Sequence, residues 1–247
     1  MSKDRSKPQP SSAVVSTGEG KDVSPTSDVD AFLAKVNTMP PATRAGEVGR
    51  LIFAMDATMS RQPTWDSALQ IQGEMFEETA KIGGLDVQLI FFRGFGECKA
   101  SKWVSDGRSL AHLMSTVSCR GGQTQIGKVL SRILKENAKH KVNAVVYVGD
   151  AMEEDVDLLC NQAGEIGLLG VPLFMFQEGY DVNAERAFRE IARLTRGAWC
   201  RFDASSARQL RELLSAVAVY ASGGRKALAD YSKAKGGEAV ALLEQLS

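Results

Sequence analysis

The chain has 247 residues, 44% of them hydrophobic, and its 30 Lys and Arg residues balance its 30 Asp and Glu residues. This length suits one large α/β domain with tails, and a net charge of +0 gives no reason to expect a nucleic acid or an anionic membrane as partner. The first ten residues lack the apolar core of a signal peptide, and no apolar run approaches the roughly 20 residues that span a bilayer. We therefore expect a cytoplasmic protein that binds neither nucleic acid nor membrane.

The cysteines argue against a zinc site. Cys98, Cys119, Cys160 and Cys200 lie far apart in the sequence, and the chain has only 2 His residues. Zinc sites need clustered thiolates and imidazoles. We expect reduced thiols that pack as small hydrophobic side chains.

The N-terminal part of the chain differs in composition from the rest. Residues 1–27 are rich in Ser, Pro, Lys and Gly, and such a segment buries too little apolar surface to offset its chain entropy. We predict a disordered tail there. Residues 28–49 are expected to form a short helix, capped by Ser27 or Asp28 and stopped by the prolines at 40–41, followed by a linker.

Continuous apolar runs predict strands that are buried on both faces of a sheet. The first such run is residues 51–55, which leads directly into Asp56. Further strands are expected at 87–92, 142–148, 171–176 and 199–202, with a hairpin over Arg93–Trp103 that leads to an edge strand.

Apolar residues that repeat at helical spacing predict helices between these strands. The expected helices cover 62–82, 109–116, 124–139, 156–166, 183–194 and 210–217. Thr124 is expected to open its helix, and Asn183 is expected to be an N-cap. Strands that alternate with helices imply right-handed crossovers and a mostly parallel sheet. We therefore predict a doubly wound α/β domain over residues 50–221, with six strands, helices on both faces and one antiparallel edge strand.

The remaining residues, 222–247, are helical in composition and are interrupted at Gly236-Gly237. Leu242, Leu243 and Leu246 form an apolar set on this C-terminal extension. We expect a helix that packs on the domain, with a handle for an oligomer or a partner as the alternative.

Oxygen-bearing side chains gather where the predicted strands end. The candidates are Asp56, Thr58, Ser60, Thr124 and Asp150. In a doubly wound sheet, the first strand and the strand after the long crossover lie side by side where the winding reverses, and the ligand crevice lies beyond their carboxyl ends. The glycine pair before Thr124 lets the backbone turn tightly toward that crevice. Because hard cations such as Mg²⁺ take oxygen ligands, the sequence predicts a metal site.

Three motifs in this order resemble the metal-ion-dependent adhesion site of von Willebrand factor type A domains. They are D-A-T-M-S at 56–60, G-G-Q-T at 121–124 and V-Y-V-G-D at 146–150. The family pattern is D-x-S-x-S, a distant Thr after a glycine-rich turn, and an Asp that ends the fourth strand. The resemblance covers residues 50–221. This sequence departs from the pattern in having Thr at position 58, Gln at 123 and Ala at 151.

The resemblance implies a role for each candidate. Thr58, Ser60 and Thr124 would approach a divalent cation by their hydroxyls, directly or through water, and Asp56 and Asp150 would anchor the hydrated metal. Mg²⁺ is the expected cation, with Mn²⁺ and Ca²⁺ as alternatives. A cation held in this way keeps residual positive charge and an open position. We therefore expect a binding module that accepts an acidic side chain of another protein at the metal.

Several of these residues, and others near them, also have a purely structural interpretation. Arg61 is expected to be an ordinary solvated side chain, with assistance to an acidic ligand as the alternative. Trp65 and Trp103 either contact a partner at the rim of the site or pack in the core. Capping explains residues such as Asp56 and Thr124 when each is taken alone, and their joint placement at one sheet edge favours the metal.

Two enzyme classes and a metal-free scaffold are the alternatives. Residues 122–129 nearly match the phosphate-binding loop G-x-x-x-x-G-K-[ST], but Val129 supplies no hydroxyl and the apolar stripe places Lys128 inside a helix. A phosphohydrolase with Asp56 as nucleophile usually needs a second carboxylate two residues later, where Thr58 stands. We therefore expect no catalytic residues and no enzyme activity.

Overall fold

The computed structural model describes residues 31, 34–35, 48–70, 84–202 and 207–234. The predicted disordered tail, most of the helix after it, the second half of the helix expected at 62–82 and the Gly236-Gly237 break lie outside these residues. The described strands are β1 (Gly49–Asp56), β2 (Leu85–Arg93), β3 (Glu97–Val104), β4 (Ala144–Gly149), β5 (Leu173–Glu178) and β6 (Ala198–Phe202). The described helices are η1 (Met59–Arg61), α3 (Gly107–Ser115), α4 (Ile126–Lys139), α5 (Val156–Leu168), α6 (Val182–Leu194) and α7 (Ala207–Ala234), and residues 62–70 are also helical.

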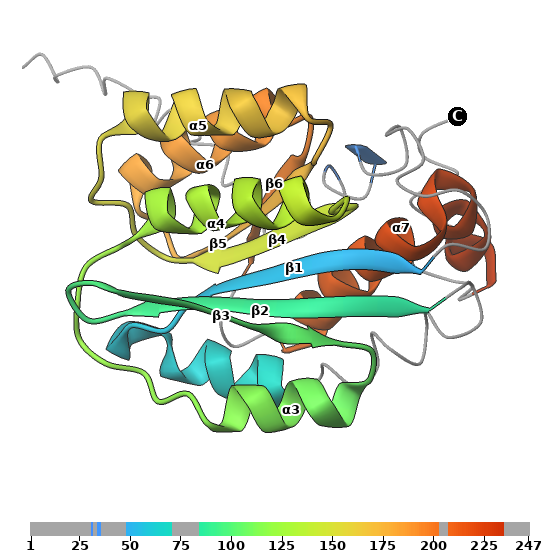
Figure 1. Cartoon of the computed structure of the whole chain (residues 1–247), viewed down its shortest axis with the longest axis horizontal. Coiled ribbons are helices and arrows are strands. Elements are labelled where there is room, and N and C mark those ends of the chain that lie inside the picture. Colours follow the sequence, from blue (N-terminus) through green and yellow to red (C-terminus); the bar gives the residue numbers. More distant parts are fainter. Residues whose placement is uncertain (1–30, 32–33, 36–47, 71–83, 203–206, 235–247) are drawn as a thin grey trace, which may run out of the picture.

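The strands form one sheet in the order β3-β2-β1-β4-β5-β6 (Figure 1). All neighbouring strands are parallel except β2 and β3, which are antiparallel. The predicted doubly wound, mostly parallel sheet with one antiparallel edge strand is confirmed. Because β1 pairs with both β2 and β4, the winding reverses between β1 and β4, and their C-terminal ends lie side by side.

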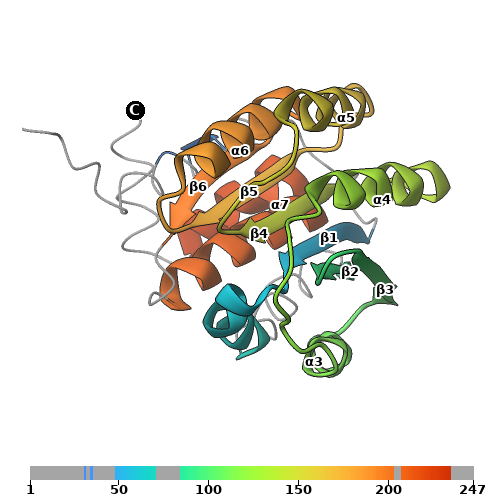
Figure 2. The same ribbon diagram turned by 90° about the vertical axis from the view of Figure 1, so that its left-hand side faces the viewer.

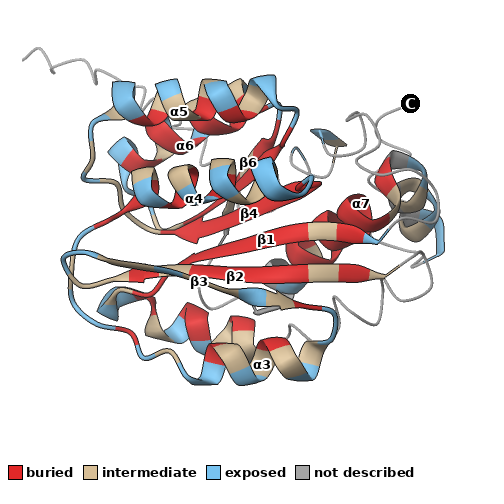
Figure 3. Cartoon of the chain, viewed as in Figure 1, coloured by how far each residue is buried: buried red, intermediate tan, exposed pale blue. Residues whose placement is uncertain are grey.

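Helices cover both faces of this sheet, and each face has its own hydrophobic core (Figures 1 and 2). Residues 62–70, α3 and α7 pack on one face, and α4, α5 and α6 pack on the other. Leu51, Phe53 and Met55 of β1 belong to the first core, whereas Ile52 and Ala54 belong to the second. Figure 3 shows β1 buried along most of its length. This double burial explains the continuous apolar run, since each large side chain stabilises the fold by roughly 1.5–3 kcal/mol.

The start of α4 differs from the sequence-based expectation. The helix begins at Ile126 with Gln125 at the N-cap position, so Thr124 lies in the segment before it. The Gln125 side chain makes no capping bond. The carboxylate of Glu154 instead accepts hydrogen bonds from the N–H groups of Ile126 and Gly127. Because this cap comes from another loop, no local sequence pattern could mark it.

The start of α6 also differs. The helix begins at Val182, and Asp181 caps it by accepting a hydrogen bond of 2.6 Å from the N–H of Ala184. The predicted cap, Asn183, is therefore wrong by two positions and lies inside the first turn. Either residue type caps well, so the choice depended on where the preceding strand ends.

The last described helix, α7, passes through the expected boundary between residues 221 and 222. Gly224 has a non-helical backbone with φ of 66° and ψ of −161°, so two helical parts meet at this residue. Leu213, Leu214 and Val217 of the first part are buried in the first core. None of the described helices is both long enough and apolar enough to cross a membrane.

Candidate metal centre

The side chains predicted as metal ligands line one cavity of about 230 Å³ at the C-terminal edge of the sheet. This edge faces the viewer in Figure 2, where the segment that leads from α3 to α4 crosses in front of the strands. The lining residues are Asp56, Thr58, Met59, Ser60, Gly121, Gly122, Thr124, Asp150, Ala151 and Glu153. Three motifs that are distant in the sequence therefore meet at one place.

Asp56 is the last residue of β1, and only 1% of its surface is exposed. Its Oδ1 accepts a hydrogen bond of 2.7 Å from the N–H of Thr58, while its buried Oδ2 has no hydrogen-bond partner. Burial raises the pKa of Asp56 to about 6, although the hydrogen bond from Thr58 opposes this shift. A buried carboxylate oxygen without a partner is costly. A cation would supply the missing partner, so this residue fits a metal site.

Thr58 and Ser60 bring two hydroxyls to the mouth of the cavity. Their Oγ atoms are 3.2 Å apart. Thr58 occupies the N-cap position of η1, yet its side chain makes no capping bond there. Both side chains are at least partly exposed, and their oxygens keep lone pairs that a cation could use.

Thr124 is joined to Glu153 by two reciprocal hydrogen bonds. The N–H of Thr124 donates to Glu153 Oε2 at 3.1 Å, and the N–H of Glu153 donates to Thr124 Oγ1 at 3.0 Å. The Thr124 hydroxyl is thus fixed in place with one lone pair left over. Glu153 is a cavity residue that sequence reasoning missed, because nothing local separates it from the other acidic residues before α5.

Asp150 follows β4 directly, and it lies close to the guanidinium of Arg61. The Nη1 atom of Arg61 lies 4.0 Å from Asp150 Oδ2, and the same guanidinium forms an ion pair with Glu178 at the end of β5. The hydroxyl of Thr64 donates to the same Glu178 carboxylate. The prediction of a solvated Arg61 is wrong, since only 1% of this residue is exposed. Its charge partners come from strands distant in the sequence, which its own neighbours could not reveal.

The two tryptophans pack against the protein itself. Trp65 is buried in the first core, and its Nε1 donates to the carbonyl of Met114. Trp103 lies on β3 opposite Gln88, near the start of β2 and therefore far from the cavity edge. The guanidinium of Arg50 lies 4.0 Å from the centre of the Trp103 ring. Core packing is the interpretation that the structure supports for Trp65, and neither side chain is at the rim.

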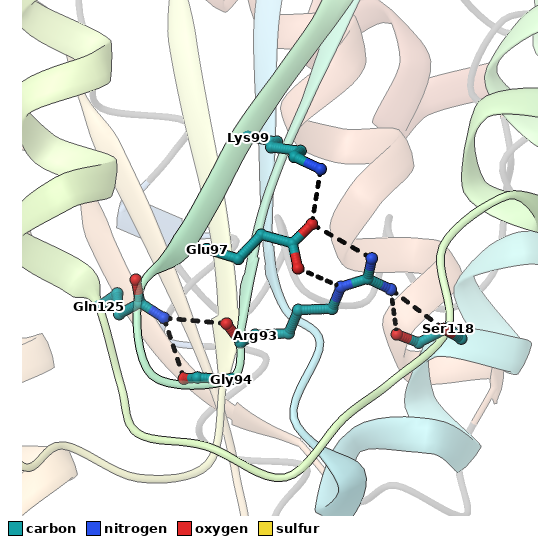
Figure 4. A network of polar contacts seen from close by, with 6 residues as sticks. All are labelled: Arg93, Gly94, Glu97, Lys99, Ser118 and Gln125. Atoms are coloured by element: carbon teal, nitrogen blue, oxygen red, sulfur yellow. Dashed lines mark hydrogen bonds and ion pairs between the residues drawn. The ribbon is translucent and has the colours of Figure 1, made fainter.

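The segment between α3 and α4 carries Thr124 and is clamped to the turn between β2 and β3 (Figure 4). Arg93 binds the Glu97 carboxylate through Nε at 2.9 Å and Nη2 at 3.2 Å, and its Nη1 donates to the carbonyl of Ser118 at 2.6 Å. Lys99 also pairs with Glu97. Hydrogen bonds from Arg93 and Lys99 lower the pKa of Glu97 to about 2, so this clamp stays ionised at neutral pH.

A second set of contacts holds the end of the same segment. The side-chain amide of Gln125 donates to the carbonyls of Arg93 and Gly94, and the N–H of Gln123 donates to the carbonyl of Gly94. A Cβ atom on Gly122 would lie 2.2 Å from the Gly94 oxygen, so only glycine allows this close approach. The turn between β2 and β3 therefore sets where the Thr124 loop lies.

Further features of the described part of the chain bear on what the cavity could hold. That part contains no group of three or more His, Cys, Asp or Glu side chains placed to hold a metal, so a cation at the cavity would depend on hydroxyls as well. The four cysteines are free thiols. Lys128 lies inside α4, and its Nζ donates to the carbonyl of Gly96 at 3.0 Å. This residue is therefore not placed as the lysine of a phosphate-binding loop.

Comparison by sequence finds no matching family model and no matching curated protein. Solved structures match at the level of the fold. Proximal thread matrix protein 1 from the mussel byssus, solved with a zinc-occupied MIDAS motif, has a TM-score of 0.51 at 15% identity and covers 73% of this chain and 47% of that chain. The VWA domain of SpRpn10 has a TM-score of 0.52 at 15% identity over 68% of this chain and 94% of that chain. The vWF domain of the pilus tip protein Mfa5 from Porphyromonas gingivalis has a TM-score of 0.55 at 9% identity over 71% of this chain and 95% of that chain. The chain thus spans about half the length of the mussel protein.

Proposed function

Because the chain has the fold of von Willebrand factor type A domains, we propose that it is a metal-dependent protein-binding module. A divalent cation is held at the C-terminal edge of the sheet, with Mg²⁺ as the first candidate and Mn²⁺ and Ca²⁺ as alternatives. An acidic side chain of a partner protein fills the open position of this cation. The proposed ligands, directly or through water, are Asp56, Thr58, Ser60, Thr124 and Asp150.

One observation carries this proposal. Asp56 Oδ2 is buried without a partner beside a cavity that the other four proposed ligands also line. A carboxylate in that state favours either protonation or a bound cation. The surrounding oxygens favour the cation, because hydroxyls and carboxylates are ligands that Mg²⁺ takes in proteins. The zinc-occupied motif of the mussel protein supports this fold as one that can hold a divalent cation.

The charges of the cavity explain why a partner carboxylate would bind. The proposed ligands Asp56 and Asp150 carry at most two negative charges, and the hydroxyls of the other three are neutral. The third carboxyl group of the cavity belongs to Glu153, which accepts the N–H of Thr124. A bound divalent cation supplies positive charge that these residues do not fully surround. The closing of a protein interface over the site would exclude water and strengthen the bond to an incoming carboxylate. A neutral or basic partner residue gains nothing comparable there.

Calorimetric titration with Mg²⁺ and Mn²⁺ tests the metal site. We expect binding by the full-length chain, no detectable binding by Asp56→Ala, and affinity weaker by at least about tenfold in Thr124→Ala, since each change removes a proposed ligand. Thr116→Ala is the matched control, because it removes an exposed hydroxyl from the same connecting segment outside the cavity. The absence of heat with the unmodified protein would mean that the chain is a metal-free scaffold.

A further inference from the structure

Large apolar side chains are exposed at few places in the described part of the chain, and most of them lie at the edge that carries the cavity. The set at this edge, here called the apolar rim, consists of Met59, Phe95, Leu158, Tyr180 and Val182. The remaining exposed ones are Val48, Leu168 and Leu169. Single exposed hydrophobic residues are normal on a protein surface, whereas several that share one sheet edge with a cavity can mark an interaction surface.

Each rim residue follows the C-terminal end of a strand. Met59 comes after β1 and lines the cavity itself. Phe95 lies in the turn between β2 and β3, and Leu158 lies in the first turn of α5, after β4. Tyr180 and Val182 lie between β5 and the first turn of α6. Because the C-terminal ends of β2, β1, β4 and β5 are neighbours in the sheet, these residues follow the same sheet edge as the cavity, and Met59 is the one that lines it.

Phe95 is the rim residue with the best-defined support. It is 85% exposed, although its neighbour Gly94 packs directly on Gly122 of the cavity wall. The turn is held by the Arg93 clamp and by the Gln125 amide (Figure 4). A large aromatic ring is thus presented to solvent on a rigid support. Aromatic anchors contribute much of the binding energy of protein interfaces, and the fixed turn leaves little backbone freedom to be lost on binding.

We propose that the apolar rim is the contact surface for a protein partner whose acidic residue is flanked by large apolar side chains. This inference rests on the proposed function, because the acidic residue is the one that reaches the cation. Phe95 is the hydrophobic anchor, and Met59, Leu158, Tyr180 and Val182 exclude water around the metal-bound carboxylate. The partner segment is an exposed loop in which an Asp or a Glu stands beside residues such as Leu, Ile or Phe.

The chemistry of the surface selects this partner over a uniformly charged one. A highly charged loop would place its other ionic groups against the rim and lose their hydration without a compensating bond. A purely apolar segment would leave the cation without its ligand. A carboxylate with apolar neighbours satisfies both parts of the surface, and dehydration of the contact strengthens the ionic bond at its centre.

A displayed library of disulfide-closed random peptides tests this proposal. The library is selected on the full-length protein in Mg²⁺ and eluted with EDTA, and recovered peptides are measured by fluorescence polarisation. We expect sequences in which Asp or Glu stands beside large apolar residues. We also expect Phe95→Ser to weaken their binding by at least about tenfold, because a buried aromatic contact is lost. Leu168→Ser is the matched control, since Leu168 is 91% exposed at the far end of α5 and should change binding by less than about twofold.

The outcomes separate this proposal from the one on which it rests. Some peptides could lose binding in EDTA and with Asp56→Ala, yet bind Phe95→Ser as tightly as the unmodified protein. That result would overturn the proposed role of the apolar rim and leave the metal-dependent function standing. Recovered peptides with only polar residues around the acid would do the same. Failure to recover any EDTA-eluted peptide would overturn both. Sedimentation that shows a dimer broken by Phe95→Ser would assign the rim to a second copy of this chain and overturn the proposed partner.

Discussion

Arg61 places a permanent positive charge inside the protein, next to the candidate metal site. An arginine stays protonated at any pH that proteins tolerate, so its burial requires negative partners. Glu178 and Asp150 provide them, and Thr64 adds a hydrogen bond to Glu178. The ion pair therefore fixes the end of β5 to η1, immediately beside the turn that carries Thr58 and Ser60.

Removal of this charge should destabilise the protein. We expect Arg61→Leu to lower the free energy of unfolding by about 3 to 5 kcal/mol in EDTA, because Glu178 is left without its counter-charge. Glu178→Leu together with Arg61→Leu should cost less than the sum of the single changes, as the two residues interact directly. Urea denaturation measures both. Arg193→Leu, which removes an exposed ion pair with Glu190, should change the free energy of unfolding far less, because solvent screens that pair. Strict additivity of the two inner changes would contradict the pairing.

Single residues also show where sequence reasoning ends. Asp56, Thr58 and Ser60 could be predicted as neighbours because they are close in the chain and follow one strand. Thr124 and Asp150 could be added to this group because the expected fold brings their segments to the same edge of the sheet. The burial of Arg61 and the place of Glu153 could not be predicted, because each depends on a contact across loops that only the folded chain creates.

The segment between α3 and α4 has no regular structure from residues 117 to 125, yet its position is determined at several points. The Arg93 clamp holds Ser118, the carbonyl of Ala57 accepts the N–H of Arg120, and Gly94 accepts the N–H of Gln123. These bonds fix the backbone of the segment, as the internal hydrogen bonds of a helix or a sheet would. The Thr124 hydroxyl therefore depends on contacts that its own segment makes with the β2–β3 turn.

The two glycines of this segment offer a matched test. Gly122→Ala would force a methyl group against the backbone of Gly94, whereas a methyl group on Gly121 would meet nothing within 4 Å. We expect Gly122→Ala to weaken Mg²⁺ affinity by at least about tenfold through displacement of Thr124, and Gly121→Ala to leave it within about twofold. Titration calorimetry provides the readout, with thermal denaturation to verify that both variants fold. Equal affinities would show that the segment tolerates movement.

The main elements were predictable because each strand and helix carries its own apolar pattern. β1 and α4 are the clearest cases. The apolar run of β1 is continuous, and the apolar residues of α4 repeat at helical spacing along one stripe. Helix starts were less predictable. The first turn of α4 is satisfied by Glu154 from another loop, and Asp181 lies two residues before the expected cap of α6.

At the scale of the whole molecule, a doubly wound sheet brings loops to one edge, and such an edge suits either binding or catalysis. The cavity here is lined mainly by hydroxyls, carboxyl groups and glycines. The alternation of strands and helices predicted the doubly wound sheet and its two helical layers, whereas the chemistry of the site depends on its side chains.

A turnover assay tests this distinction. We expect no hydrolysis of ATP or of p-nitrophenyl phosphate above background by the full-length protein in Mg²⁺ or Mn²⁺, because Thr58 stands where a phosphohydrolase usually has its second carboxylate. Release of phosphate is the measurement, and Asp56→Ala is the control for contaminating activity. Metal-dependent hydrolysis that disappears in Asp56→Ala would make the protein an enzyme and replace the binding role.

The reciprocal bonds between Thr124 and Glu153 have a mechanical consequence. They tie the loop before α4 to the loop before α5, and Glu154 adds a second tie to the first turn of α4. A tethered partner that pulls on the Thr124 side would load both loops at once, and the force would be shared between two helices that are each anchored in the same core. The two loops are thus coupled, so a displacement of the Thr124 loop would be passed on to the loop before α5.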